Sequence, residues 1–291
     1  MRPAHVIEII TPKKFVLDGL WFGPKKAKRA IIVIHGLTSS AFSLQHVVGA
    51  LVGKDTAVIT FNNRGFKSVV DIKQRLSKKE TKWHTAGSAH EVFTECIDDI
   101  QGVVNFAKKV GVKNIYLAGH STGCQKSIYW ASKTGGRGVK GIILLAPLSD
   151  YACEKYADKS GRMKKATALA RALVNAKKPH ELLPRWASPI MLLDAQRYLS
   201  LYTPDSAEEI FTYGQPGKKP KTYQSIKLPV LVLFADKDEH SDRPAEKLVE
   251  WFAQNTGSRY FRAGIVPKVR HSFRGGESRV AQLVRQWILA Q

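Results

Sequence analysis

The pentapeptide GHSTG, at residues 119–123, constrains the fold of this chain more than any other feature. It directly follows an apolar run, residues 114–118, and directly precedes a segment with the composition of a helix. A serine on a sharp turn between a strand and a helix needs flanking glycines, because the turn leaves little room for neighbouring side chains. The helix behind such a serine points its N-terminal N–H groups toward developing negative charge. The pattern therefore predicts a nucleophilic serine, Ser121, at the end of a buried strand.

Two later segments contain the partners that a nucleophilic serine requires. One apolar run ends in Asp236-Lys237-Asp238, and the last apolar run of the chain is followed by His271. A serine hydroxyl is a weak nucleophile near neutral pH, so it needs an imidazole to take its proton and a carboxylate to orient that imidazole. We predict Ser121 as nucleophile, His271 as base and Asp238 as acid, all at strand ends, where an open parallel sheet places its site. Asp236 remains a second candidate for the acid.

A fourth element has the composition of an oxyanion-binding loop. The apolar run 30–34 leads into His35-Gly36-Leu37. An acyl-transfer intermediate needs two N–H donors for its oxyanion, one of which belongs to the residue after the nucleophile. We predict the backbone N–H groups of Thr122 and Leu37 as these donors, with Gly36 allowing a close approach of the backbone. His35 is predicted to have a structural role within this loop.

With the chain order Ser, Asp, His and a His-Gly loop after an early strand, the chain resembles the α/β-hydrolase family over nearly its whole length. The resemblance implies a mostly parallel central sheet flanked by helices, a Ser-His-Asp triad, a backbone oxyanion hole and no cofactor. Within the family, GHSTGCQ at 119–125 and NNRG at 62–65 are similar to the siderophore-esterase-like branch. Two positions depart from the common pattern. Residues 62–65 are NNRG where D-x-R-G is usual, so Asn62 replaces the aspartate, and Ala235 stands where a glycine often opens the turn to the acid.

Residues 151–228 interrupt the alternation of strands and helices and are far longer than an ordinary connection. The sequence predicts helices over 154–176 and 189–201 within them. In this family an insertion after the sixth strand is a cap over the serine, so we expect a core of residues 1–150 and 229–291 and a cap between them. Candidates for lining the pocket, each of which fits the core of the cap equally well, are Trp186, Met191, Tyr198, Tyr202 and Phe211.

The other elements follow from local patterns. Alternating residues predict an antiparallel hairpin over 6–10 and 15–22. Residues 64–88 are polar, basic and poorly periodic, so a long loop is expected there. An apolar stripe predicts an amphipathic helix over 89–110. Strands separated by helices favour an α/β fold with a parallel sheet.

The chain has 46 Lys and Arg residues against 24 Asp and Glu, a net charge of +22 that raises the question of nucleic-acid binding. Residues 151–228 hold 14 basic and 7 acidic residues, a surplus of 7, which leaves 22 − 7 = 15 for the remaining residues. The charge is thus spread along the chain rather than gathered in one stripe. We therefore expect no specific nucleic-acid site.

The cysteines and the apolar runs limit the class of protein further. Cys96, Cys124 and Cys153 form no disulfide framework and show no metal-ligand spacing. No apolar run reaches the length of a membrane span, and the first residues lack the apolar core of a signal peptide. We expect a cytoplasmic protein without metal or cofactor.

These expectations combine into one activity, the hydrolysis of carboxylic esters by a serine esterase of lipase-like mechanism, through an acyl-enzyme. The cations Lys268 and Arg270 flank His271 and suggest that the small-molecule ester is anionic. Thioesterase, amidase, peptidase and acyltransferase chemistry use the same machinery and stay open. The alternative from another class is a non-catalytic protein of the same fold that binds polyanions. The sequence does not predict the oligomeric state.

Overall fold

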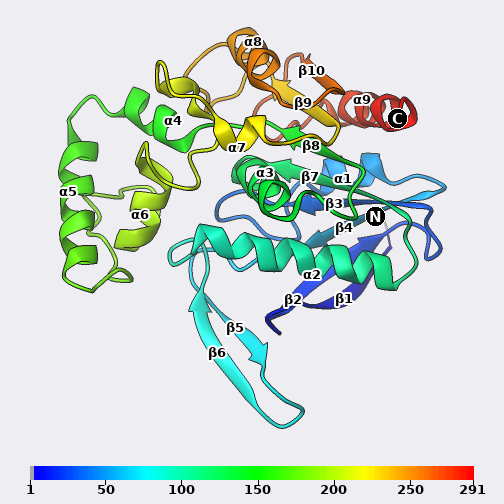
Figure 1. The fold of residues 1–291 in the computed structure, drawn as a ribbon, viewed down its shortest axis with the longest axis horizontal. Helices are drawn as coiled ribbons and strands as arrows, with labels where there is room; N and C mark the ends of the chain where they lie inside the picture. Colours follow the sequence, from blue (N-terminus) through cyan, green and yellow to red (C-terminus); the bar gives the residue numbers. More distant parts are fainter. Residues whose placement is uncertain (1–2) are drawn as a thin grey trace.

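The computed structural model describes residues 3–291, which form one central sheet covered by helices (Figure 1). The strands of this sheet are β1 (Ala4–Ile10), β2 (Val16–Phe22), β3 (Arg29–Ile34), β4 (Thr56–Phe61), β7 (Asn114–His120), β8 (Gly141–Leu145), β9 (Val230–Ala235) and β10 (Phe261–Val266). Their order is β1-β2-β4-β3-β7-β8-β9-β10. β2 pairs antiparallel with β1 and β4, whereas the pairs from β4 through β10 are parallel. The predicted α/β class and the first hairpin are thus confirmed.

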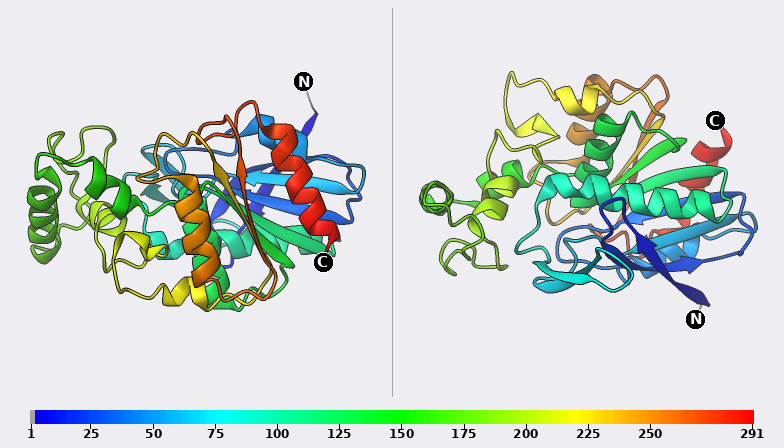
Figure 2. Two further views of the ribbon diagram at one scale, coloured as in Figure 1. Left: turned by 90° about the horizontal axis from the view of Figure 1, so that it is seen from above. Right: turned by 60° about the horizontal axis from the view of Figure 1, so that its bottom comes forward.

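Helices cover both faces of the sheet, which explains why its parallel strands are apolar throughout. One face carries α2 (Cys96–Lys109), α3 (Thr122–Thr134) and α8 (Ala245–Asn255), and the other carries α1 (Gln45–Leu51) and α9 (Glu277–Leu289) (Figures 1 and 2). Each layer encloses its own cluster of buried apolar side chains. Because the strands are parallel, the loops after β3, β7, β9 and β10 leave the sheet at the same edge.

The prediction of a long loop over 64–88 is wrong. β5 (Val70–Arg75) and β6 (Thr81–Ala86) pair antiparallel and project from the body of the protein (Figure 1). Most of their side chains are exposed or half-buried, so neither face carries the apolar alternation that marks a strand in sequence. Backbone pairing holds the hairpin, together with an N–H bond from Arg75 to the carbonyl of Lys14.

The prediction of one helix over 154–176 is also wrong, since the structure has α4 (Asp150–Ala157) and α5 (Arg162–Asn175). The break is at Asp158, whose carboxylate accepts the backbone N–H groups of Ser160 and Met163 and so satisfies the first turn of α5. Gly161 adopts φ 74° just before that helix. A capping side chain within a helical sequence pattern therefore divides the predicted helix into two.

The segment between β8 and β9 also contains α6 (Ala195–Tyr202) and α7 (Lys221–Gln224). α5 and α6 lie at one end of the protein (Figures 1 and 2) and enclose a separate apolar cluster. α6 starts later than the predicted 189–201, because the Asp194 carboxylate accepts the N–H of Arg197 and caps the helix there. Likewise α2 begins only at Cys96, after a short 3₁₀ turn (Phe93–Glu95), so residues 89–92 are a loop rather than the start of the predicted helix.

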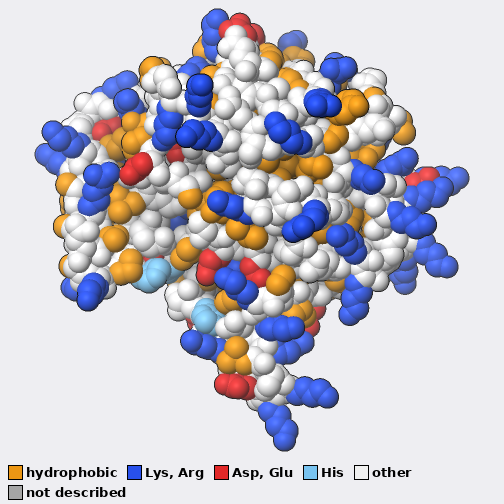
Figure 3. Space-filling model, in the orientation of Figure 1, with side chains coloured by type: hydrophobic (Ala, Val, Ile, Leu, Met, Phe, Trp, Pro, Cys, Tyr) orange, Lys and Arg blue, Asp and Glu red, His pale blue; other side chains and the backbone are white. Residues whose placement is uncertain are grey.

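On the face in Figure 3, Lys and Arg side chains are scattered over the whole surface rather than concentrated on one element. Among residues 3–291, no helix is both long enough and apolar enough to cross a membrane.

Candidate active site

Ser121 occupies the turn between β7 and α3 with φ 53°, a left-handed value that a residue with a side chain adopts only under constraint. The two glycines of the pentapeptide explain how this turn is packed. A Cβ on Gly119 would collide with the carbonyl of Gly123, and a Cβ on Gly123 would collide with the carbonyl of Ile34. Glycine is therefore required at both positions by close backbone contacts, as expected for a nucleophile elbow.

His271 and Asp238 form the only contact between the predicted triad residues that the structure records as a hydrogen bond within residues 3–291. His271 Nδ1 lies 2.8 Å from Asp238 Oδ2, and both side chains are nearly buried. The competing carboxylate is engaged elsewhere, because Asp236 Oδ2 accepts the backbone N–H of Lys268 at 3.2 Å. The geometry thus pairs the imidazole with Asp238 rather than with Asp236.

Three neighbours of His271 were not predicted from the sequence. Glu239 Oε2 accepts the backbone N–H of His271 at 2.9 Å. His120 Nε2 lies 3.0 Å from the carbonyl of His271, and burial lowers the pKa of His120 to about 3, so its neutral ring donates this bond. The His240 ring stands edge-on to that of His271 at 4.8 Å between centroids. Glu239 and His240 adjoin Asp238 in sequence, but only the fold brings them to the loop after β10.

The loop after β3 lies against the elbow. A Cβ on Gly36 would be 2.9 Å from Ser121 Cβ and 3.5 Å from its Oγ, so glycine allows this approach. The next residue, Leu37, is half-buried and packs against the apolar cluster of α5 and α6. His35 bonds within the loop, with Nδ1 2.8 Å from the carbonyl of Gly36. Burial, aided by the Lys126 cation, lowers the pKa of His35 to about 4, which makes it a neutral structural residue as expected.

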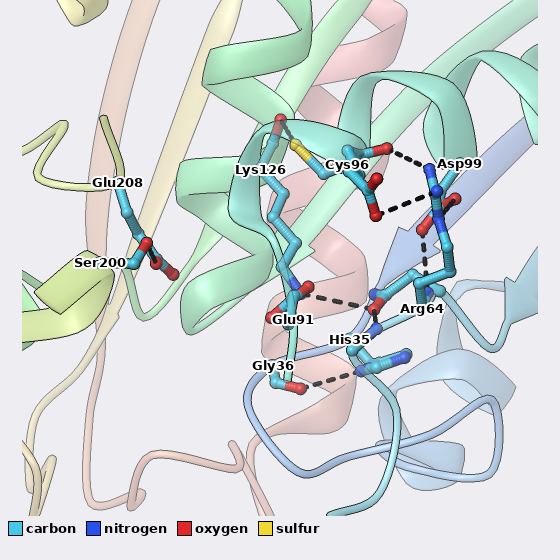
Figure 4. A network of polar contacts seen from close by, with 12 residues as sticks. His35, Gly36, Arg64, Glu91, Cys96, Asp99, Lys126, Ser200 and Glu208 are labelled. Atoms are coloured by element: carbon cyan, nitrogen blue, oxygen red, sulfur yellow. Dashed lines mark hydrogen bonds and ion pairs between the residues drawn. The ribbon is translucent and has the colours of Figure 1, made fainter. Parts of the chain in front are cut away.

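A chain of buried charges lies beside α3 and was missed from the sequence (Figure 4). Lys126, on α3, forms an ion pair with Glu91, whose other oxygen lies 3.0 Å from Arg197 on α6. Arg197 in turn pairs with Glu208. All four side chains, which we call the buried charge chain, are at most 6% exposed. Burial alone would raise the pKa of Glu91, but Lys126 and Arg197 hold it below its ordinary value.

The sequence does contain one sign of this chain of charges. Lys126 lies in the first half of α3, and every residue from 122 to 128 is buried. A lysine at such a position requires an anionic partner, because burying an unpaired ammonium is very costly. The sequence gives no indication of which carboxylate that is, since Glu91 lies 35 residues earlier in a loop (126 − 91 = 35).

The unusual NNRG segment packs against the same region (Figure 4). Arg64 is buried and pairs with Asp99 at 2.8 Å, near the start of α2. A Cβ on Gly65 would collide with the carboxylate of Glu91, so this glycine makes room for the buried charge chain. Asn62, which replaces the usual aspartate, accepts the N–H of Ala41 at 2.8 Å and ties the loop to the segment after β3.

The five candidate lining residues have different surroundings. Tyr198 is completely buried in the α5–α6 cluster, and Phe211 is completely buried in the main core. Both side chains therefore belong to the packed interior and do not line a pocket. Met191 and Tyr202 pack against the α5–α6 cluster while half-buried, and Trp186 is exposed. A role in lining a pocket thus stays open only for the last three.

Comparisons with known proteins identify the family and the fold of the chain. Residues 82–290 match the sequence profile of a family described as "Protein of unknown function (DUF1749)". No curated protein matches the chain.

Solved structures of three proteins are similar in fold over almost the entire chain. The siderophore hydrolase EstB from Aspergillus fumigatus has a TM-score of 0.69 and 17% identity, covering 100% of this chain and 98% of that one. Est1E from Butyrivibrio proteoclasticus, with ferulic acid bound, has a TM-score of 0.64 and 19% identity, covering 98% of each. An esterase from Pyrococcus furiosus has a TM-score of 0.61 and 18% identity, covering 99% and 91%. At these identities the likeness shows the fold, which is that of the α/β-hydrolases.

Proposed function

The chain belongs to the DUF1749 family and has the α/β-hydrolase fold, and from this premise we propose that it is a serine hydrolase that cleaves carboxylic esters. The observation that carries the proposal is the 2.8 Å bond between His271 Nδ1 and Asp238 Oδ2 at the sheet edge that also carries the Ser121 elbow. A positioned imidazole with an orienting carboxylate beside a constrained serine is the arrangement that acyl transfer needs.

In the proposed mechanism Ser121 Oγ attacks the ester carbonyl carbon while His271 Nε2 accepts the hydroxyl proton. The Asp238 carboxylate holds Nδ1–H and stabilises the imidazolium. Backbone N–H groups of Thr122 and Leu37 bind the oxyanion, at the start of α3 and beside Gly36. The imidazolium then protonates the departing alcohol, leaving an acyl-enzyme. Water, deprotonated by His271, releases the carboxylic acid and restores the serine.

We also propose that residues 151–228 act as a cap over this site. The contact of Leu37 with the α5–α6 cluster supports the idea, because it joins the oxyanion loop to the insertion. Helices in that position would bound the acyl or alcohol side of the pocket, with Met191, Tyr202 and Trp186 as the lining candidates that remain.

An ester is favoured as the substrate class because EstB is a siderophore hydrolase, the Pyrococcus protein is an esterase, and Est1E binds ferulic acid. Thioesters and amides are alternative substrates for the same machinery. Ester turnover, measured together with labelling of the serine, distinguishes an esterase from these alternatives. A non-catalytic polyanion-binding role has less support, since the basic residues are scattered over the visible face (Figure 3).

The test is hydrolysis of p-nitrophenyl esters from acetate to decanoate by the wild type and Ser121→Ala, with Ser132→Ala as control. Ser132 lies on the same helix, where its hydroxyl bonds only to the Tyr129 carbonyl in the contacts recorded for residues 3–291. Ser121→Ala should lose at least about 10³-fold in kcat, and Ser132→Ala should keep wild-type turnover. Labelling of Ser121 by a fluorophosphonate without ester turnover would point to a thioester or amide. The absence of both ester turnover and fluorophosphonate labelling would reject the hydrolase assignment.

A further inference from the structure

Three residues far apart in sequence meet at the junction between the core and the insertion. His90 lies in the loop before α2, His180 follows α5, and Asp194 caps α6. Asp194 Oδ2 is 3.0 Å from His90 Nδ1 and 2.8 Å from His180 Nδ1. Each of the three residues offers one possible ligand atom, and these atoms lie within 4.8 Å of one another. Two imidazole nitrogens therefore meet at one carboxylate oxygen.

We propose that His90, His180 and Asp194 form a binding site for a divalent transition-metal ion, with Zn²⁺ as the best match. Imidazole nitrogen and carboxylate oxygen are ordinary ligands of zinc, at about 2.0–2.2 Å from the ion. A tetrahedral ion at that distance separates its ligand atoms by roughly 3.3 Å. The observed 2.8 and 3.0 Å need to open by a few tenths of an ångström, and the two histidine nitrogens, which lie within the 4.8 Å limit, need to approach each other. Mg²⁺ and Ca²⁺ fit poorly, because they prefer oxygen ligands.

The carboxylate of this site is positioned by contacts that leave one oxygen to the histidines. Asp194 is completely buried, and its Oδ1 accepts the backbone N–H of Arg197 at 2.7 Å. Its own N–H donates to the carbonyl of Ala89 at 2.8 Å, which fixes Asp194 beside the His90 loop. Outer contacts of this kind orient metal ligands and add to affinity. The site is therefore organised by α6 capping before any ion arrives.

Access and coordination number follow from the histidines. The His180 side chain is 59% exposed, so an ion reaches the site from solvent, and a water molecule completes the coordination as the fourth ligand. In the ion-free protein the Nδ1–H of each ring donates a hydrogen bond to Asp194 Oδ2. On metal binding each Nδ1 gives up that proton to solvent and ligates the ion instead.

The position of the site defines what the ion would do. His90 belongs to the core and the other two ligands to the insertion, so a bound ion would tie α6 to the loop before α2. The ligands are distinct from Ser121, Asp238 and His271, and metal binding needs no substrate. The proposal thus goes beyond ester hydrolysis and is tested independently of it. A metal ion that joins two residues far apart in the chain stabilises the folded state, because it closes the loop between them.

The experiment is calorimetric titration of the chelator-treated full chain with ZnCl₂ at pH 7.5. We expect one equivalent of Zn²⁺ to bind, and His90→Gln and His180→Gln each to weaken its affinity at least tenfold. His5→Gln, at an exposed histidine on β1, serves as the matched control and should bind as the wild type does. MgCl₂ at the same concentrations should give no binding heat.

Thermal unfolding supplies a second readout. Because an ion that binds only the folded state raises its stability, Zn²⁺ should raise the Tm of the wild type and of His5→Gln, but not of His180→Gln. His180 is largely exposed, so its replacement leaves the fold intact, which circular dichroism checks. Equal zinc affinity in the wild type, His90→Gln and His180→Gln would overturn the proposal, as would the absence of binding by the wild type.

Discussion

The region around Ser121 and the junction between core and insertion are built by opposite means. The elbow depends on backbone contacts, with Gly36, Gly119 and Gly123 allowing main-chain segments to touch. The junction depends on ionised side chains, which form the buried charge chain from Lys126 to Glu208. Ser121 is thus positioned by packing of uncharged backbone, whereas α6 is positioned by charges.

The difference has an energetic consequence. Close contacts between backbone segments permit only glycine at the contact point. Disturbing such a contact leaves no charge unpaired. Buried ions are costly unless every charge has its partner, so displacing α6 would leave Glu91 or Arg197 uncompensated. The charges therefore oppose alternative placements of the insertion more strongly than they add to net stability. Variants of the two regions should accordingly fail in different ways, the first in activity and the second in folding.

The largest effect is expected at Asp238, which we propose as the acid that orients His271. Asp238→Asn should lower kcat for a p-nitrophenyl ester by about 10⁴-fold, because an amide cannot hold the imidazole in the required tautomer or stabilise its cation. Steady-state kinetics measure this loss, and urea unfolding should show little change in stability.

Asp236→Asn is the matched control, two residues away. Its carboxylate bonds to the backbone of Lys268 rather than to an imidazole, so kcat should fall less than tenfold. If instead Asp236→Asn were the more damaging change, the acid would have been assigned to the wrong carboxylate.

An intermediate effect is expected in the buried charge chain. Glu91→Gln keeps the side-chain shape but leaves Lys126 buried without a carboxylate, so the free energy of unfolding should fall by about 3–5 kcal/mol. Urea denaturation of the purified variant measures the loss.

Two further variants sharpen that result. Adding Lys126→Met to Glu91→Gln removes the unpaired cation and should restore part of the lost stability. Glu250→Gln, which breaks an exposed pair with Lys247 on α8, should change stability by less than about 1 kcal/mol. Similar losses from the buried and the exposed pair would show that the junction does not depend on its charges.

The smallest effect is a pH dependence in the insertion. Burial raises the pKa of Glu209 from 4.5 to about 7, although Ser149 and Gln215 donate hydrogen bonds to its carboxylate. Between these two pKa values the folded protein holds a proton that the unfolded chain has lost, so its stability falls as the pH rises.

Glu209→Gln removes this proton equilibrium. From pH 5 to pH 8 the wild type should therefore lose up to about 3 kcal/mol of unfolding free energy relative to the variant. Urea denaturation at the two pH values provides the comparison. Parallel pH profiles would mean that Glu209 ionises normally in the folded protein.

Local patterns were enough to predict much of the fold. Buried parallel strands appear in the sequence as apolar runs. The glycines on either side of Ser121 indicate a sharp turn, because no larger residue fits at those two positions. The first hairpin and the α/β class followed directly from such patterns. The β5–β6 hairpin did not, because its exposed strands lack the alternation that burial imposes.

By itself the sequence determined the strands of the central sheet and the sharp turn at Ser121, because each depends on neighbours within one segment. Only the tertiary structure decided that His271 bonds to Asp238 rather than Asp236, two carboxylates alike in sequence. It alone joined Lys126 to Glu91, and His90 to His180 and Asp194. Such contacts link segments far apart in the chain. Their partners follow from where the sheet and helices place each loop, which no local pattern encodes.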